Sequence, residues 1–180
     1  NTAMYFMPCL NPDGYVFNQT TNPNGGGFWR KNRRDNGDGT MGVDLNRNYD
    51  YEWAYDDTGS SPNTDSQTYR GPSGFSEPET QALKMGAVLA GEDRLRLYID
   101  THSFTLIYLS HYTNNTARND LNNRLALIMR AANDYKYRYS ASRSGSGIGS
   151  TDEYFANTYQ ALSYTLEIEP LSSSSEYGGF

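Results

Sequence analysis

The feature that most restricts how this chain folds is a stretch from Asn11 to about Pro72 with almost no hydrophobic periodicity. It covers about a third of the sequence and is rich in Gly, Asn, Asp and Pro. Loops of that length are uncommon in compact domains and usually carry a function or hold a ligand. Flexible linkers contain few aromatic side chains, but this stretch holds many, including Phe28, Trp29 and Trp53. We therefore expect a folded region with little regular secondary structure.

The length and the net charge of the chain limit the kinds of function that it can have. A chain of 180 residues is long enough for one domain with its own hydrophobic core. The 15 Lys and Arg against 21 Asp and Glu give a net charge of −6, which suits neither nucleic acid nor an anionic membrane surface as partner. No apolar run approaches the ~20 residues of a membrane-spanning helix. Cys9 is the only cysteine, so the chain forms no internal disulfide.

Regular structure is predicted on both sides of the long stretch. The apolar residues 2–7 indicate a buried strand. Ser76-Glu77-Pro78-Glu79 has the pattern of a capping box, and Ala82, Met85 and Leu89 follow at helical spacing. Further along we expect strands over 95–100, 105–109 and 162–168, helices over 118–133 and 151–160, and a Ser/Gly-rich loop over 140–150. Strands that alternate with helices indicate an α/β layered fold.

Two residues stand where chemistry is expected in such a fold. His102 falls at the carboxyl end of a predicted strand, close to Asp100, and ligands bind at that edge of α/β sheets. Glu167 lies within an apolar strand, where a carboxylate must be paired, hydrogen-bonded or functional. The structural alternatives are a satisfied core histidine and a polar strand face shared with Glu169.

The long stretch also holds a basic cluster, comprising Arg30, Lys31, Arg33 and Arg34, and a later Asn46-Arg47 pair. The planar paired donors of arginine fit a carboxylate, so these residues suggest recognition of a small anion or of a chain-terminal carboxylate. Solvated surface charge is the alternative interpretation.

Asp35-Asn36-Gly37-Asp38-Gly39 resembles a calcium-binding loop in composition. The spacing of an EF-hand is not met and no Glu stands at its closing position. We therefore rank a simple turn ahead of a Ca²⁺ site.

Taken in order, the motifs resemble those of the zinc carboxypeptidases of the carboxypeptidase A type. Each motif alone is weak, but the series in this order is specific, and it runs from about residue 1 to 180. The matching segments are Asn11-Pro12-Asp13-Gly14, Trp29-Arg30-Lys31-Asn32-Arg33, Gly42-Val43-Asp44-Leu45-Asn46-Arg47-Asn48, Tyr69-Arg70-Gly71-Pro72, Phe75-Ser76-Glu77-Pro78-Glu79-Thr80, Asp100-Thr101-His102-Ser103-Phe104, Gly149-Ser150-Thr151-Asp152 and Thr165-Leu166-Glu167.

The resemblance implies a mixed β-sheet flanked by α-helices and a role for each matching residue. His102 corresponds to a zinc ligand, and Glu167 corresponds to the general base that activates a zinc-bound water. Arg30 corresponds to the arginine that stabilises the oxyanion. The residues implied to bind substrate are Asn46 and Arg47, which clamp the C-terminal carboxylate of a peptide, Ser103 and Phe104, which line the cleft, and Thr151, at the floor of the side-chain pocket.

One part of the family pattern is missing. The family's other two zinc ligands belong to a His-x-x-Glu motif upstream of Asn-Pro-Asp-Gly, and the ten residues before Asn11 contain neither His nor Glu. A catalytic zinc site needs about three protein ligands. We therefore expect residues 1–180 to be an internal part of a single peptidase domain, incomplete at both ends.

The expected activity is zinc-dependent removal of the C-terminal residue of peptides by a secreted or periplasmic enzyme. The alternatives are a murein-peptide hydrolase with the same chemistry and a non-catalytic peptide-binding pseudoenzyme. Ser150 and Thr151 supply no counter-charge at the pocket floor, which favours apolar or aromatic C-terminal residues, while the adjacent Asp152 leaves a basic preference open.

Overall fold

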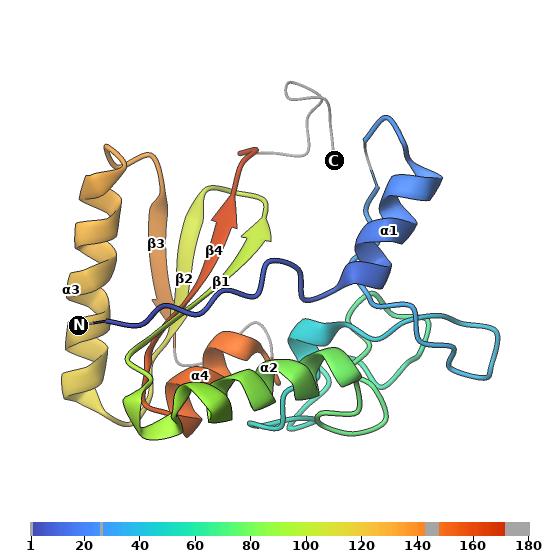
Figure 1. Ribbon diagram of the computed structural model, residues 1–180, viewed down its shortest axis with the longest axis horizontal. Coiled ribbons are helices and arrows are strands. Elements are labelled where there is room, and N and C mark those ends of the chain that lie inside the picture. The colour runs from blue at the N-terminus through green and yellow to red at the C-terminus, as the bar shows by residue number, and fades with distance from the viewer. Residues whose placement is uncertain (1, 26, 143–147, 172–180) are drawn as a thin grey trace. The chain divides into compact units, whose positions relative to one another are not determined.

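The computed structural model describes residues 2–25, 27–142 and 148–171, which divide into two compact units (Figure 1). Residues 2–95 and 148–150 belong to the first unit, and residues 96–142 and 151–171 belong to the second. Of the helices in these ranges, none combines the length and apolar character that crossing a bilayer requires.

The second unit is built on a four-stranded mixed sheet with the strand order β1-β4-β2-β3. The strands are β1 (Leu97–Ser103), β2 (Ile107–His111), β3 (Arg138–Ser142) and β4 (Leu162–Ile168). β1 runs parallel to β4 and β2 runs parallel to β3, whereas β2 and β4 are antiparallel. The expected mixed sheet flanked by helices is therefore confirmed.

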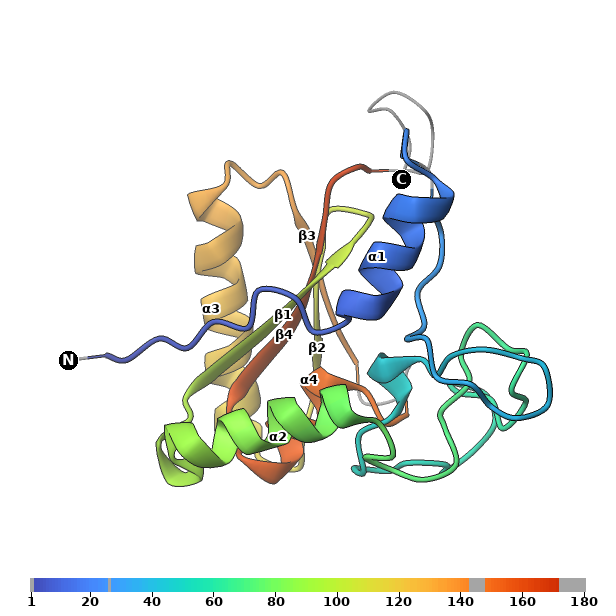
Figure 2. The ribbon, with the colours of Figure 1, turned by 45° about the vertical axis from the view of Figure 1, so that its right-hand side comes forward.

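Two helices cover opposite faces of this sheet, α3 (Thr116–Ala132) and α4 (Thr151–Thr158). On the α3 face, the Tyr164 hydroxyl donates to the backbone carbonyl of Asn122 at 2.5 Å. On the other face, the rings of Tyr98 in β1 and Phe155 in α4 stack with their centroids 3.8 Å apart. Figure 2 turns the sheet toward its edge, with α3 along one side. Successive strand residues therefore point alternately toward α3 and toward α4.

The first unit contains α1 (Pro12–Thr21), the short 3₁₀ segments η1 (Leu45–Arg47) and η2 (Glu92–Arg94), and α2 (Pro78–Ala90). Long loops connect them, and Asn48, which is fully buried, holds these loops together. Its amide nitrogen donates to the carbonyls of Arg70 and Ser73 and to the Ser76 hydroxyl. Its amide oxygen accepts from the backbone of Glu77 and the hydroxyl of Thr80. The Asn48 side chain thus provides the hydrogen bonds that the buried backbone of these loops would receive from neighbouring residues in a helix or a sheet.

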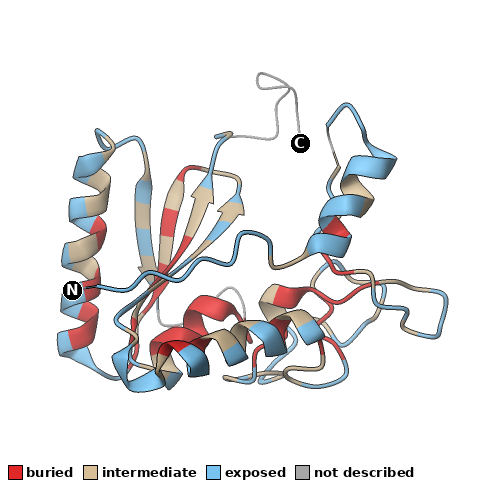
Figure 3. Cartoon of the chain, viewed as in Figure 1, coloured by how far each residue is buried: buried red, intermediate tan, exposed pale blue. Residues whose placement is uncertain are grey.

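Several sequence expectations need correction in this unit. Residues 2–7 form no strand and are exposed, as Figure 3 shows for the chain start. The long stretch does contain regular structure, since α1 lies within it. The Asn11 side chain caps this helix by accepting from the Gly14 backbone, and Pro12 occupies the first turn. α2 begins at Pro78 with Glu77 as its N-cap, where a capping box starting at Ser76 was expected. That box does not form, and the Ser76 hydroxyl donates to the Glu77 carboxylate instead.

The apolar positions expected on α2 do not enter the core. Met85 and Leu89 are exposed, and the buried residues of this helix are Thr80, Ala87 and Ala90.

The second unit follows the sequence expectations more closely. β4 has the predicted bounds, and α3, α4, β1 and β2 lie within a few residues of theirs. β3 was not predicted, and its residues 140–142 were assigned to the Ser/Gly-rich loop. Residues 143–147 of that loop lie outside the described residues.

Candidate active site

The centre of the candidate site is the pairing of His102 with Glu167. The parallel register of β1 and β4 places these two residues opposite each other near the carboxyl ends of both strands. Laterally paired residues in a parallel sheet point to the same face, and here it is the face that α4 covers. A histidine and a glutamate therefore stand side by side at the sheet edge where α/β proteins bind ligands.

A third side chain on this face, Asp100, connects two of the predicted site residues. One of its carboxylate oxygens, Oδ2, lies 3.1 Å from His102 Nε2 and also accepts the Thr151 hydroxyl at 2.5 Å. From the sequence, Asp100 stood out only as a neighbour of His102. The signal that identifies it is strand alternation, since residues two apart in β1 share a face.

The other predicted residues of the second unit flank this cluster. Ser103 ends β1, and Phe104 follows it after a cis peptide bond. Thr151 opens α4 and is buried. The second unit therefore brings together His102, Glu167 and Thr151 through the α4 face of the sheet.

The first unit holds the predicted arginines around one buried carboxylate, Asp44. A guanidinium nitrogen of Arg30 lies 3.0 Å from Asp44 Oδ2, while Oδ1 accepts the backbone N–H of Asn46 at 3.1 Å. Arg47 donates from Nε to the Gly59 carbonyl and from Nη1 to the Asn46 carbonyl, each at 2.7 Å. Asp44, which the sequence analysis did not single out as a site residue, therefore fixes both the half-exposed Arg30 and the turn that carries Asn46 and Arg47.

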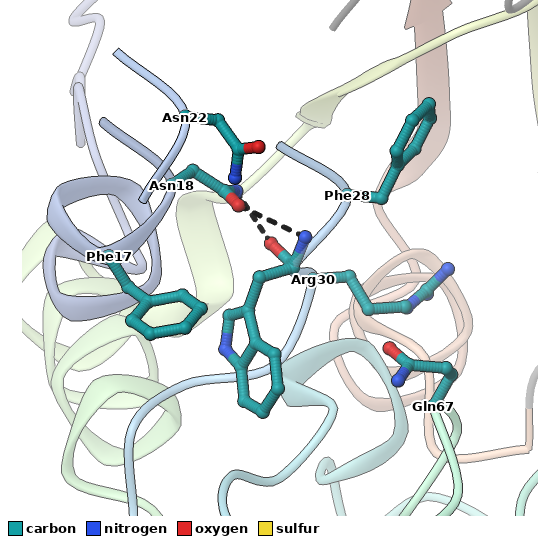
Figure 4. Close-up of a pocket in the computed structure, with 7 residues that line it drawn as sticks. Phe17, Asn18, Asn22, Phe28, Arg30 and Gln67 are labelled. Atoms are coloured by element: carbon teal, nitrogen blue, oxygen red, sulfur yellow. Dashed lines mark hydrogen bonds between the residues drawn. The ribbon is translucent and has the colours of Figure 1, made fainter. Parts of the chain in front are cut away.

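An open pocket of about 430 Å³ adjoins Arg30 in this unit (Figure 4). Arg30 and Gln67 stand on one side and Phe17 on the other. The Asn18 side chain supports the pocket wall by exchanging hydrogen bonds with both backbone groups of Trp29. The pocket combines aromatic walls with a cationic side chain, a lining suited to an anionic organic group.

The expected alternative of a Ca²⁺ site at residues 35–39 is not supported. Asp35 accepts the backbone N–H of Gly37, as in an ordinary Asx turn. Asp38 accepts from the backbone and hydroxyl of Thr40 and from the hydroxyl of Thr64. The Thr40 and Thr64 hydroxyls lower the pKa of Asp38 from 3.8 to about 2. Both carboxylates are thus used to hold the loop.

The zinc expectation has a different outcome. Within residues 2–25, 27–142 and 148–171, no group of three or more His, Cys, Asp or Glu side chains is arranged to hold a metal ion. A catalytic zinc needs about three protein ligands, and His102 is the one residue here predicted to be such a ligand. The described residues therefore do not fit a complete zinc site.

Comparison with known proteins places these residues in a family. The family model described as zinc carboxypeptidase matches residues 1–176. The chain belongs to the zinc carboxypeptidase family. This zinc carboxypeptidase chain is 32% identical to human carboxypeptidase O over 190 residues, covering 99% of the chain and 48% of the relative. It is 39% identical to a metallocarboxypeptidase A-like protein of Trichophyton verrucosum over 109 residues, covering 60% of the chain and 24% of that protein.

Solved structures agree with the family assignment. The carboxypeptidase A of Helicoverpa armigera superposes with a TM-score of 0.73 at 30% identity, covering 97% of this chain and 44% of that structure. The chain thus spans about half or less of the length of the carboxypeptidases it matches.

Proposed function

We propose that the full protein is a zinc-dependent metallocarboxypeptidase that hydrolyses the C-terminal peptide bond of peptides, and that residues 1–180 are part of its single peptidase domain. The observation that carries this proposal is the register pairing of His102 with Glu167, in a chain whose family match extends across both units. The same resemblance underlies the proposal of a secreted or periplasmic location.

The proposed roles follow from the position and chemistry of each side chain. Zinc, when bound, polarises a carbonyl oxygen and lowers the pKa of water toward ~7. Glu167, which pairs in register with the candidate ligand His102, would accept a proton from the attacking water and return it to the leaving amine. By the family resemblance, Arg30 would stabilise the negative charge that develops on the carbonyl oxygen.

Substrate recognition is assigned to the other predicted residues. Arg47 and Asn46 would bind the terminal carboxylate, which an internal peptide bond lacks. The guanidinium of Arg47 is oriented by two backbone carbonyls, a geometry that suits paired recognition of a carboxylate. Ser103 and Phe104 would line the cleft, and Thr151 would form the pocket floor.

Zinc content and terminal selectivity test the proposal together. We expect about one zinc per molecule of full-length protein by elemental analysis. We also expect cleavage of a peptide with a free C-terminus and none of its C-terminally amidated copy. Glu167→Gln should abolish turnover while leaving zinc content unchanged. A zinc-loaded protein that leaves free C-termini intact would refute the proposal.

A non-catalytic peptide-binding protein is the second candidate. It is favoured by one observation, namely that the described residues do not complete a metal site. That candidate predicts peptide binding through Arg47 without turnover even after zinc is added. Calorimetry with a free and an amidated peptide, in the presence of zinc, separates the two functions.

A further inference from the structure

One oxygen of the Asp100 carboxylate is buried and makes no hydrogen bond within the described part of the chain. Oδ2 is engaged by His102 and Thr151, whereas Oδ1 has no hydrogen-bond partner among the described residues, and its own surface is inaccessible. A buried carboxylate oxygen without a donor is costly, and more so when the group is charged. A donor from a bound molecule would satisfy this oxygen.

Among the described residues the one ion-pair contact of Asp100 is the imidazole of His102, and no Lys or Arg forms a salt bridge with it. The neighbouring acids of α4 contact a different imidazole, because His111 lies between them, 3.3 Å from Asp152 and 3.6 Å from Glu153. Asp152, adjacent to Thr151 in sequence, therefore directs its charge to His111. Asp100 is the carboxylate that contacts Thr151.

We propose that Asp100 determines side-chain specificity and makes the site prefer substrates with a C-terminal lysine or arginine. The proposal rests on the proposed function, in which Thr151 forms the floor of the pocket for that side chain. The ammonium or guanidinium of the substrate would donate to Oδ1 of Asp100, while the Thr151 hydroxyl donates to Oδ2.

Discrimination follows from what each substrate leaves unpaired. A basic side chain supplies both the missing donor and a positive charge, and hydrogen bonds to charged groups are the stronger ones. An apolar side chain of similar length would leave Oδ1 unsatisfied. Sites built to pair with a polar group reject analogues that lack it. The apolar preference suggested by Ser150 and Thr151 alone is therefore reversed once Asp100 is included.

The test uses the full-length protein and peptides that differ only in their last residue. We expect kcat/KM to be at least tenfold higher for C-terminal Lys or Arg than for Leu or Phe. Asp100→Asn keeps the size of the side chain and an acceptor for Thr151 but removes the charge. It should lower kcat/KM for the basic peptides by about tenfold to a hundredfold, with the Leu and Phe peptides changed by less than about threefold. Asp120→Asn, the same chemical change at an exposed position of α3, is the matched control and should alter neither.

A second measurement separates this proposal from the proposed function. Calorimetry with free L-arginine and L-phenylalanine, as product analogues, reports side-chain preference without turnover. Arginine binding that is lost in Asp100→Asn supports the assignment even if no peptide is cleaved, in which case only the proposed function fails. Cleavage that favours Phe, or a basic preference unchanged in Asp100→Asn, overturns the assignment and leaves the carboxypeptidase proposal standing. If the protein neither cleaves the peptides nor binds arginine preferentially, both proposals are overturned.

Discussion

His111 Nε2 lies 3.3 Å from Asp152 Oδ2, beneath the first turn of α4. Both side chains are at least nine-tenths buried, and Glu153 approaches the other ring nitrogen of His111 at 3.6 Å. The end of β2 is thereby joined to the start of the helix that carries Thr151. Two adjacent buried carboxylates are tolerable at this position because one imidazole faces both of them.

Removing this imidazole should destabilise the fold. His111→Leu would leave two buried carboxylates without their shared partner, and we expect the free energy of unfolding to fall by about 3–5 kcal/mol. His111→Gln retains a side-chain donor and should cost less. Urea unfolding followed by circular dichroism measures both variants. An unchanged midpoint in His111→Leu would contradict the assigned role of the contact.

Asn48 should be among the least replaceable side chains of the first unit. Asn48→Ala removes the partner of five hydrogen bonds in a fully buried position, and we expect a loss of about 3 kcal/mol or more. Asn48→Asp keeps the shape but replaces the amide donor with a carboxylate oxygen that faces three oxygen acceptors, so it should be comparably destabilising. Asn24→Ala, in an exposed turn, is the control and should change stability by less than about 0.5 kcal/mol. Chemical denaturation of the three variants checks the ranking.

The fold of the second unit could be predicted from local signals more fully than that of the first. β4 is an apolar run between turn residues, and α3 shows a helical period of apolar residues. Both elements can therefore be recognised without knowing which other elements they pack against. Residues 2–7 have the apolar composition of a strand, but a strand forms only where a neighbouring strand pairs with it, and composition does not show this. α1 was missed although Asn11 and Pro12 mark its start, because its own apolar period is weak.

The candidate site shows a similar limit. Motif order identified His102, Glu167, Arg30 and Arg47, because the family resemblance is carried by short segments around them. The pairing of His102 with Glu167 depends on the register of two strands 65 residues apart along the chain, which no local pattern fixes. The linking roles of Asp44 and Asp100 arise from contacts to other segments or elements, and they became visible only in three dimensions.

The Asp38 loop should contribute stability that depends on acid pH. The hydrogen bonds from Thr40 and Thr64 favour the ionised carboxylate and lower its pKa from 3.8 to about 2 in the folded state. The contribution is therefore fully present above pH 3.8 and is lost as the pH falls through about 2. We expect the difference in unfolding free energy between the wild type and Asp38→Ala to shrink over this window. Equilibrium unfolding at pH 5, 3 and 2 measures it, and a difference that does not change with pH would rule out this linkage.

Arg47 should act on the free carboxylate of the substrate and on little else. In the full-length protein we expect Arg47→Lys to lower kcat/KM for a peptide by about tenfold to a hundredfold, because an ammonium cannot reproduce the paired donors of a guanidinium and the positions fixed by the Gly59 and Asn46 carbonyls. Binding of the C-terminally amidated peptide should be weak in the wild type and unchanged in the variant. Steady-state kinetics and calorimetry provide the two readouts, with Arg124→Lys on α3 as a control for the same exchange elsewhere. Equal losses for the free and amidated peptides would show that Arg47 supports the loop structure and does not select the chain terminus.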